Sequence, residues 1–310
     1  MENRYIDMHI HTNNSDGSLT VETVLKKAEE LQLDIISITD HNTVSAYDEI
    51  EDKKIRNFYK GKIIPGIEIT TTYNGEIIEI LGYGINTSKM KALLKENLCH
   101  IENRKAVETQ LTLNTLKNYG VYFSPEFEKN IIENPEILFN TKKGPSKTSF
   151  IEELKKYPQN AKFFESQEQM ERMTYRDFSR QFMYNPKSKL YVNQSQFYIS
   201  LEKTIDMIHE AGAFAFLAHL YEYSPTIAEN LENITNNYPL DGLECYYTTF
   251  TKEQSQFLEK YCKEHQLYKS CGSDFHGYEI KPNNPMGLAT EKEKMNESII
   301  SEWIEKVNKI

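Results

Sequence analysis

Histidines and carboxylates recur at the ends of predicted strands. His9 and His11 are two residues apart on one predicted strand, so both imidazoles point to the same side. Two imidazoles that project together are a common start of a metal site. The other candidates at predicted strand ends, or just beyond them, are Asp16, Asp40, His41, Glu68, His219, Asp274 and His276. A single histidine on a strand is more often a hydrogen-bonded core residue, but the set as a whole indicates a shared metal centre.

The elements that would carry these residues alternate in a βα rhythm. Predicted strands cover residues 5–11, 34–39, 62–68, 77–83, 214–218 and 242–246, and a last strand leads into residues 270–274. Amphipathic helices separate most of them, and a terminal helix is expected near residues 296–307. Active sites of (β/α) barrels lie at the C-terminal ends of their strands, where this pattern places every candidate. We therefore expect an α/β fold with the site at a barrel mouth.

The rhythm is interrupted in the middle of the chain. Residues 88–198 are polar, rich in Lys, Glu and aromatic residues, and contain no strong strand candidate. We predict a barrel made of residues 1–88 and 199–310, and an inserted helical lid or substrate subdomain made of residues 89–198.

Composition narrows the functional class. The formal net charge of −10 argues against an extended nucleic-acid surface, which needs clustered Lys and Arg. The four cysteines are widely spaced, so neither a zinc knuckle nor a disulfide framework is expected. No signal peptide or membrane-length apolar run is found, so we expect a cytoplasmic protein without a membrane partner.

The order of these motifs resembles a known family. The pattern HxH…DG…TDHNT…GIE…AHL…GSDFHG is similar to that of the PHP (polymerase and histidinol phosphatase) family. With an insert after the fourth strand, the chain resembles stand-alone PHP phosphoesterases that act on nucleotides and short oligonucleotides. The resemblance covers residues 4–90 and 198–290. It implies a distorted, TIM-like (β/α)7 barrel that holds two or three divalent ions: manganese, iron or zinc.

The resemblance also implies a ligand set. The implied metal ligands are His9, His11, Asp16, His41, Glu68, His219, Asp274 and His276. Within this set Asp16, His41, His219 and Asp274 are also expected to be catalytic. Glu79 departs from the pattern, because relatives usually carry histidine there. It is either a harder ligand that favours Mn²⁺ or Fe²⁺, or a solvated residue at a strand end. Asp40 is expected to accept the second N–H of His41 and to orient its ring.

The sequence offers many metal ligands but neither a nucleophile motif nor a P-loop. This combination favours hydrolysis of a phosphate ester through a metal-bridged hydroxide. The expected enzyme is a metal-dependent phosphoric ester hydrolase (EC 3.1) acting on a nucleotide, a short oligonucleotide or another small phosphorylated substrate. For phosphate binding, Arg104 matches an arginine of relatives, whereas Lys147 and Ser149 replace an Arg-x-His-like turn. Lysine lacks the bidentate fork of arginine. Arg104 and Lys147 could equally be solvated helix charges.

Two alternatives stay open, a histidinol-phosphate-type monoester phosphatase and a metal-binding module without turnover. The near-complete ligand set argues against the second. Aromatic residues of the insert, such as Tyr175, Phe178 and Phe182, could stack on a base, although their helical spacing is more typical of a core. The residues interpreted as structural or surface residues are His100, His209, His265 and Cys271.

Overall fold

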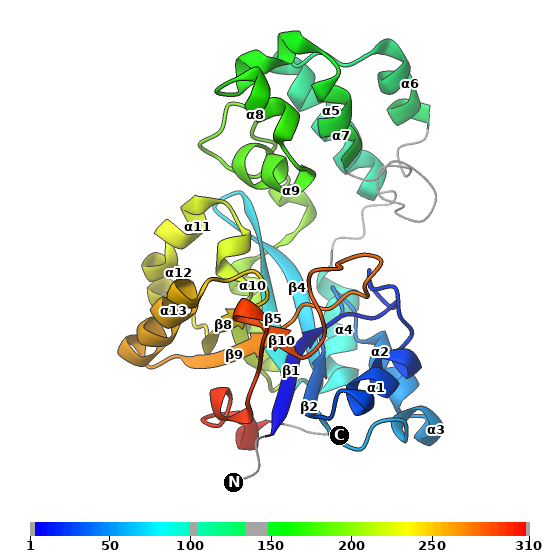
Figure 1. Ribbon diagram of the computed structural model, residues 1–310, viewed down its shortest axis with the longest axis vertical. Coiled ribbons are helices and arrows are strands. Elements are labelled where there is room, and N and C mark those ends of the chain that lie inside the picture. The colour runs from blue at the N-terminus through cyan, green and yellow to red at the C-terminus, as the bar shows by residue number, and fades with distance from the viewer. Residues whose placement is uncertain (1–3, 99–103, 134–147, 308–310) are drawn as a thin grey trace.

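The protein has a mixed α/β body and a group of helices above it (Figure 1). The computed structural model describes residues 4–98, 104–133 and 148–307. The predicted α/β fold class is confirmed. In this described part, no helix is both long and apolar enough to cross a lipid bilayer.

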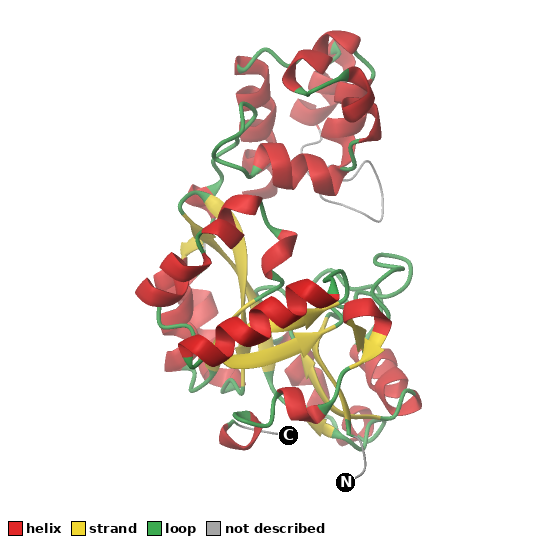
Figure 2. Cartoon of the chain, turned by 60° about the vertical axis from the view of Figure 1, so that its left-hand side comes forward, coloured by secondary structure: helices red, strands yellow, loops and turns green. Residues whose placement is uncertain are grey.

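The strands of the body form two larger sheets, seen as yellow arrows in Figure 2. The first has the order β1-β2-β3 and the second β6-β4-β5-β7-β8-β9. Their bounds are β1 (Tyr5–Ile10), β2 (Leu33–Ile38), β3 (Lys62–Ile63), β4 (Gly66–Tyr73), β5 (Glu76–Tyr83), β6 (Ile199–Ser200), β7 (Phe214–Leu217), β8 (Gly242–Tyr247) and β9 (Tyr268–Gly272). A separate small sheet pairs β10 (Leu288–Ala289) with β11 (Glu293–Lys294).

Two isolated bridges connect the two larger sheets. Ile10 pairs with Phe275 just beyond β9, and His41 just beyond β2 pairs with Glu68 in β4. The strands therefore follow one another around a ring. β5 runs antiparallel to both of its neighbours, β4 and β7, whereas most other pairs are parallel. This reversal distorts the barrel.

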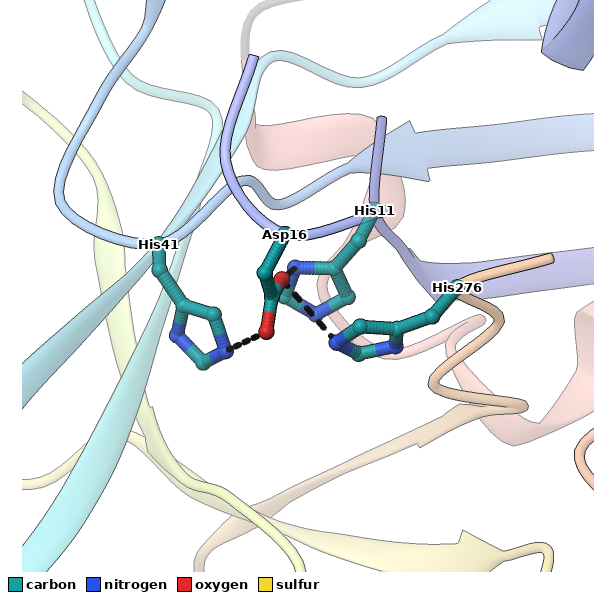
Figure 3. A group of neighbouring side chains, drawn as sticks. All are labelled: His11, Asp16, His41 and His276. Carbon is teal, nitrogen blue, oxygen red and sulfur yellow. Dashed lines mark ion pairs between the residues drawn. The ribbon is translucent and has the colours of Figure 1, made fainter. Parts of the chain in front are cut away.

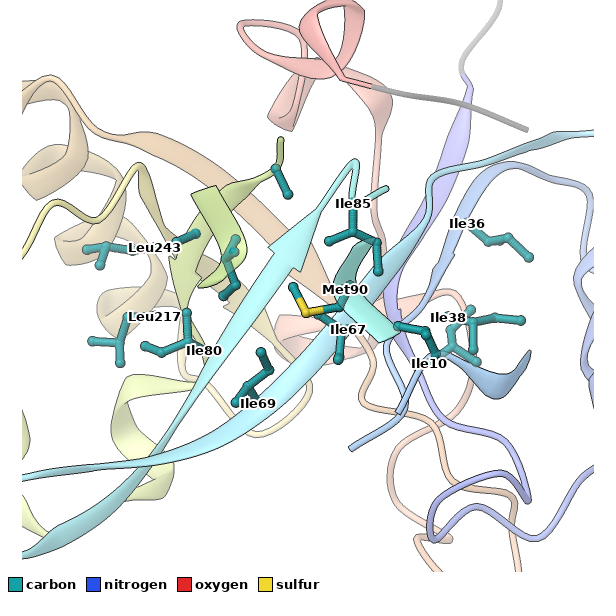
Figure 4. Packing of buried hydrophobic residues seen from close by; sticks show 14 of the residues in the cluster. Ile10, Ile36, Ile38, Ile67, Ile69, Ile80, Ile85, Met90, Leu217 and Leu243 are labelled. Atoms are coloured by element: carbon teal, nitrogen blue, oxygen red, sulfur yellow. The ribbon is translucent and has the colours of Figure 1, made fainter. Parts of the chain in front are cut away.

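Helices cover the outside of the ring. They are α1 (Val21–Glu30), α2 (Ser45–Ile50), α3 (Lys53–Arg56), α4 (Thr87–Asn97), α10 (Leu201–Glu210), α11 (Pro225–Glu229), α12 (Leu231–Asn237) and α13 (Lys252–His265). Local sequence fixes their ends: the Thr20 side chain caps α1, and a capping box between Thr251 and Gln254 begins α13. The apolar sides of these helices and the strands share one core, part of which is drawn in Figure 4.

The inserted helices have a core of their own. They are α5 (Arg104–Asn118), α6 (Pro125–Glu133), α7 (Thr148–Lys155), η2 (Pro158–Phe163), α8 (Gln167–Arg172), α9 (Tyr175–Phe178) and η3 (Ser179–Met183). Residues such as Leu116, Ile151 and Phe178 form a hydrophobic cluster separate from that of the barrel. By contrast, α4 packs Met90 into the barrel core. The predicted domain boundaries and the lid role stay predictions.

Two sequence-based expectations about elements are wrong, the unbroken strand at 62–68 and the terminal helix at 296–307. The predicted strand at 62–68 is broken after β3, because Pro65 has no N–H for a strand ladder. Glu68 therefore lies near the start of β4, not at a strand end. β4 and β5 form a hairpin whose turn, Asn74-Gly75, has positive φ at both residues (50° and 86°). Glu79 consequently lies in mid-strand.

The expected terminal helix at 296–307 is also absent. In its place are two short 3-10 turns, η7 (Glu297–Ile299) and η8 (Ile304–Lys306). Between them the buried Trp303 stacks on Tyr83, with ring centroids 5.3 Å apart, and donates its indole N–H to the carbonyl of Lys269. Anchoring one large ring against the barrel therefore outweighs the helical spacing of the segment.

Candidate metal centre

Four predicted ligands from three loops point toward one another in Figure 3: His11, Asp16, His41 and His276. Each offers a ligand atom, and these atoms all lie within 4.8 Å of one another. Asp16 Oδ1 lies 3.1 Å from His276 Nε2 and 3.7 Å from His11 Nδ1. Asp16 Oδ2 lies 3.7 Å from His41 Nε2. Three loops that are distant in sequence thus present one set of donor atoms.

A second group lies deeper and shares His11. It combines His9, His11, Glu68 and Asp274. His9 Nε2 and His11 Nε2 are 3.1 Å apart, and each is 3.2 Å from Glu68 Oε2. Both imidazoles and the Glu68 carboxylate are fully buried. Gly272 permits this close approach of β9 to β1, because a Cβ there would lie 2.1 Å from His9 Cβ.

The third group contains Glu79. His41 Nδ1 lies 3.1 Å from Glu68 Oε2 and 3.4 Å from Glu79 Oε1. His219 Nε2 approaches the same two carboxylates, at 3.0 Å from Glu68 Oε1 and 3.3 Å from Glu79 Oε2. The Glu79 side chain is 21% exposed. It faces the histidines from mid-strand, so the alternative of a solvated strand-end residue does not describe its position.

These separations suit divalent cations. Donor atoms that each lie about 2.0–2.2 Å from one ion are about 3.0–3.6 Å from each other in octahedral or tetrahedral geometry. Several buried ligand atoms also have no hydrogen-bond partner among the described residues, including Glu68 Oε2, His41 Nδ1 and His276 Nε2. Buried polar atoms are rarely left in this state. The donor set therefore fits bound metal ions, although the ligand roles themselves stay predictions.

The charges of the centre depend on one another. Burial opposes protonation of His11 and His219, but the neighbouring carboxylates of Glu68, Asp274 and Glu79 prevail and raise both pKa values to about 10. Burial also opposes ionisation of Glu68, yet the surrounding histidines hold its pKa well below the usual range. Without metal, protonated imidazoles neutralise the carboxylates. A divalent cation can replace these protons.

Among the hydrogen bonds of the described residues, none joins the Asp40 carboxylate to the N–H of the His41 ring, although such a bond was expected. The Asp40 carboxylate accepts hydrogen bonds from the Thr12 backbone N–H (2.7 Å), the Thr12 hydroxyl (2.6 Å) and the Ser15 hydroxyl (2.6 Å). The side chain turns toward the loop after β1, because that loop offers three donors. Asp40 thus fixes the loop that presents Asp16, which is an indirect role at the centre.

Three residues beside the centre were missed from the sequence. Glu244 in β8 accepts hydrogen bonds from His9 Nδ1 at 2.9 Å and from the backbone N–H of His219 at 2.7 Å. Tyr247 donates to Asp274 Oδ2 at 2.6 Å, and Lys281 Nζ donates to the same oxygen at 2.5 Å. Glu244 could have been noticed in the sequence as a charged residue inside a buried strand, whereas nothing in the sequence indicates Tyr247 or Lys281.

The predicted phosphate-binding residues are not brought to the centre by any contact of the described residues. Arg104, at the start of α5, lies over the ring of Tyr198 at 5.0 Å and 3.9 Å from the Glu108 carboxylate. Lys147 lies outside the described residues, and Ser149 is described only as a backbone position in α7. The substrate roles of all three stay predictions.

Among the described residues, the other candidates of the sequence analysis belong to none of the three donor groups. Phe178 is buried in the core of the insert, and Tyr175 and Phe182 pack against it, which supports the core interpretation. His209 pairs with Asp241 at 2.8 Å. The other positions are His265, stacked on Tyr261, buried Cys271, and His100, which lies outside the described residues.

Comparison with known proteins decides the family. The model described as PHP domain matches residues 7–142. The chain contains a PHP domain. The predicted family is therefore confirmed, and so is the predicted class, a metal-dependent phosphoric ester hydrolase.

This PHP-domain chain is also similar to curated proteins over most of its length. It is 26% identical over 273 residues to the 5'-3' exoribonuclease Rnm of Escherichia coli, covering 87% of this chain and 84% of that protein. It is 23% identical to the 3',5'-nucleoside bisphosphate phosphatase of Chromobacterium violaceum, covering 87% of each chain. A solved structure of an amidohydrolase from Chromobacterium violaceum, with bound sulfate and no metal, shares the fold with a TM-score of 0.60 and 22% identity, covering 94% of this chain and 92% of that one.

Proposed function

We propose that this PHP-domain enzyme hydrolyses phosphate esters of nucleotides and short oligonucleotides, with divalent ions held by the predicted ligands. The observation that carries the proposal is the sharing of donors: His11, His41 and Glu68 each belong to two of the three groups. Neighbouring groups with common ligands hold ions close together, as phosphoester hydrolysis by several metal ions requires. The similarity to an exoribonuclease and to a nucleoside bisphosphate phosphatase supports the substrate class.

In this proposal the centre holds two or three ions. His9, His11, Glu68 and Asp274 would hold one, and His11, Asp16, His41 and His276 the next. His41, Glu68 and Glu79, with His219 beside them, would hold a third. The mixture of imidazoles and carboxylates suits manganese, iron or zinc. Such ions activate water and polarise the phosphoryl group when they are bound.

The chain's own residues would admit and hold the substrate. Asp16, His41 and Glu79 keep side-chain exposures of 56%, 23% and 21%, so the centre opens to solvent on their side. Lys281 adds a positive charge at Asp274, where it could neutralise a phosphoryl oxygen. The cytoplasmic location stays a prediction.

A substrate screen tests this function. Protein stripped with a chelator and reloaded with Mn²⁺ is incubated with nucleoside monophosphates, nucleoside 3',5'-bisphosphates, 5'-phosphorylated trinucleotides and histidinol phosphate, and released phosphate or nucleotide is measured. We expect metal-dependent turnover, with a nucleotide or oligonucleotide preferred over histidinol phosphate by at least about tenfold in kcat/KM. Preference for histidinol phosphate would favour the monoester phosphatase, and no turnover of any ester would favour a non-catalytic module.

A further inference from the structure

Strand β8 contains a β-bulge beside the metal centre. Glu244 of β8 pairs with Ser270 of β9. The next pair, Tyr246 with Cys271, advances β8 by two residues and β9 by only one. Cys245 is thus an extra residue in β8 without a partner of its own in β9. Bulges change the direction in which neighbouring side chains point, and they are common next to active sites.

The bulge turns two residues of β8 toward the metal centre. Glu244 and Tyr247 are three residues apart, and side chains at an odd separation point to opposite faces of a regular strand. Here Glu244 bonds the His9 ring at 2.9 Å. Tyr247 bonds the Asp274 carboxylate at 2.6 Å. The extra residue therefore lets both side chains face predicted metal ligands.

The side chain of the extra residue faces the opposite way, toward helix α13, which packs against β8 and β9 (Figure 1). Cys245 Sγ lies 3.5 Å from Cys262 Sγ of α13. Both residues are free thiols, 0% and 1% exposed. Tyr246 also faces this helix, because its hydroxyl bonds Glu259. A pair of thiols thus contacts the outer side of the bulge, while the predicted metal ligands contact its inner side.

The two thiols are placed to be joined by oxidation. A disulfide bond of about 2.05 Å requires the two sulfur atoms to approach by only about 1.5 Å. Burial and the neighbouring Cys262 thiol raise the pKa of Cys245, so this thiol stays protonated and reacts slowly. Its buried position also excludes bulky disulfide oxidants. The pair should therefore respond to a sustained excess of a small oxidant.

We propose that Cys245 and Cys262 form a reversible disulfide with hydrogen peroxide as the oxidant, and that this bond weakens metal binding by displacing the bulge in β8. One thiol attacks the peroxide: an S–O bond forms, the O–O bond breaks, and a sulfenic acid and one water result. The second thiol attacks that sulfur, the S–O bond breaks, and a second water leaves. The two thiols lose two electrons and two protons, and the peroxide is reduced to two waters.

The bulge connects this bond to the metal centre. The disulfide would draw Cys245 toward α13 and move the backbone between Glu244 and Tyr247. A close-packed interior does not absorb such a shift at one residue. Loss of a group that orients a metal ligand through a hydrogen bond typically weakens metal binding by about 10- to 100-fold. The inference rests on the predicted ligands of the proposed function and not on hydrolysis itself.

The test follows the disulfide and the metal affinity in the same samples. Every protein compared carries Cys99→Ser, because Cys99 lies outside the described residues and could form a competing disulfide. Metal-free protein is treated with hydrogen peroxide and digested without reduction, and mass spectrometry should find Cys245 and Cys262 in one linked peptide pair. Competition with a fluorescent chelator should show Mn²⁺ binding weakened by about tenfold, and dithiothreitol should restore it.

Two variants control for other oxidised residues. Cys262→Ala removes one thiol of the pair, so its Mn²⁺ affinity should match that of the untreated parent protein and should not respond to peroxide. Cys271→Ala is the matched control, because Cys271 is a buried thiol in β9 with no sulfur partner among the described residues. It should respond to peroxide as the parent protein does.

The outcomes separate the parts of the proposal. Absence of the linked peptide pair would overturn the disulfide, and unchanged affinity in the disulfide form would overturn its effect on the metal centre. An equal loss of affinity in treated Cys262→Ala would assign the loss to another residue. Because no step depends on turnover, the proposed hydrolysis can fail while this inference stands. Reduced protein that binds no Mn²⁺ would instead refute the ligand set on which both rest.

Discussion

The barrel mouth and the inserted helices differ in how their charged side chains are buried and paired. At the mouth, His9, His11 and Glu68 are fully buried and lie against one another. In the insert, the hydrophobic cluster is apolar, and charged pairs such as Arg172 with Glu168 are exposed. A buried carboxylate there, Glu153, pairs with the exposed Lys156 and not with other buried ionisable groups. Burying ionisable groups costs free energy that an apolar core would not. The comparison favours the barrel mouth as the place of the proposed chemistry, whereas the insert folds by ordinary apolar packing.

The largest effect is expected from removing a shared ligand. His11→Ala and Asp274→Ala should each reduce metal-dependent hydrolysis by about a thousandfold or more, because each substitution removes a buried ligand from a metal-binding group. Steady-state assays and metal content by mass spectrometry measure this. The matched control His209→Ala removes a histidine that pairs with Asp241 away from the centre, and it should retain activity. Normal activity in a ligand variant at controlled metal concentration would refute its assignment.

Much of this centre could be predicted because its residues stand close to strand ends within short, distinctive motifs. His219, Asp274 and His276 needed no knowledge of the fold beyond strand order. Glu68 and Glu79 were found by motif. Glu68 was placed at a strand end because the break at Pro65 was not expected, and the Asn74-Gly75 hairpin that joins β4 to β5 was not recognised. The ion pairs of Arg176 and Arg180 with Glu222 could not be predicted, because only the packing of the insert on the barrel brings these residues together.

A smaller effect is expected from Glu244, which touches the ligands without belonging to any of the three donor groups. Glu244→Gln should weaken metal binding by about 10- to 100-fold, because it loses the charge that orients and polarises His9. Competition with a fluorescent chelator measures the affinity. The control Glu76→Gln alters another buried carboxylate, one that bonds Ser224 and Thr226, and should leave metal affinity unchanged. Equal affinities in both variants would restrict Glu244 to a packing role.

Substitutions of Glu79 test whether this residue sets the metal preference of the third donor group in the barrel mouth. Glu79→His replaces a hard carboxylate with an imidazole at the third group, so the preference for Zn²⁺ over Mn²⁺ should rise by about tenfold. Metal content after dialysis against an equimolar mixture measures this preference. Glu79→Gln, which removes the charge and keeps the shape, should lower the occupancy of one ion for either metal. An unchanged metal ratio in Glu79→His would show that Glu79 does not bind metal.

The smallest effect is a pH response that should arise in the barrel and not in the insert. In metal-free protein the pKa values of His11 and His219 are raised from 6.5 to about 10. Folded protein therefore keeps protons that the unfolded chain releases, so this stabilisation is complete below pH 6.5 and is lost as the pH rises through 10. Glu68 and Asp274, with lowered pKa values, stabilise the fold above about pH 4.5 and lose this effect in acid.

The melting temperature of chelated protein should consequently fall by about 5 °C or more between pH 7 and pH 9.5. Mn²⁺ should flatten this slope, because the cation takes the place of the protons at the same imidazoles. Hydrogen exchange can locate the response: amides of β1 and β4 should lose protection with rising pH after correction for intrinsic exchange rates, while those of α7 should not. A slope of the same size in the insert would mean that the pH response is not a property of the buried histidines, and the contrast between the two regions would then be lost.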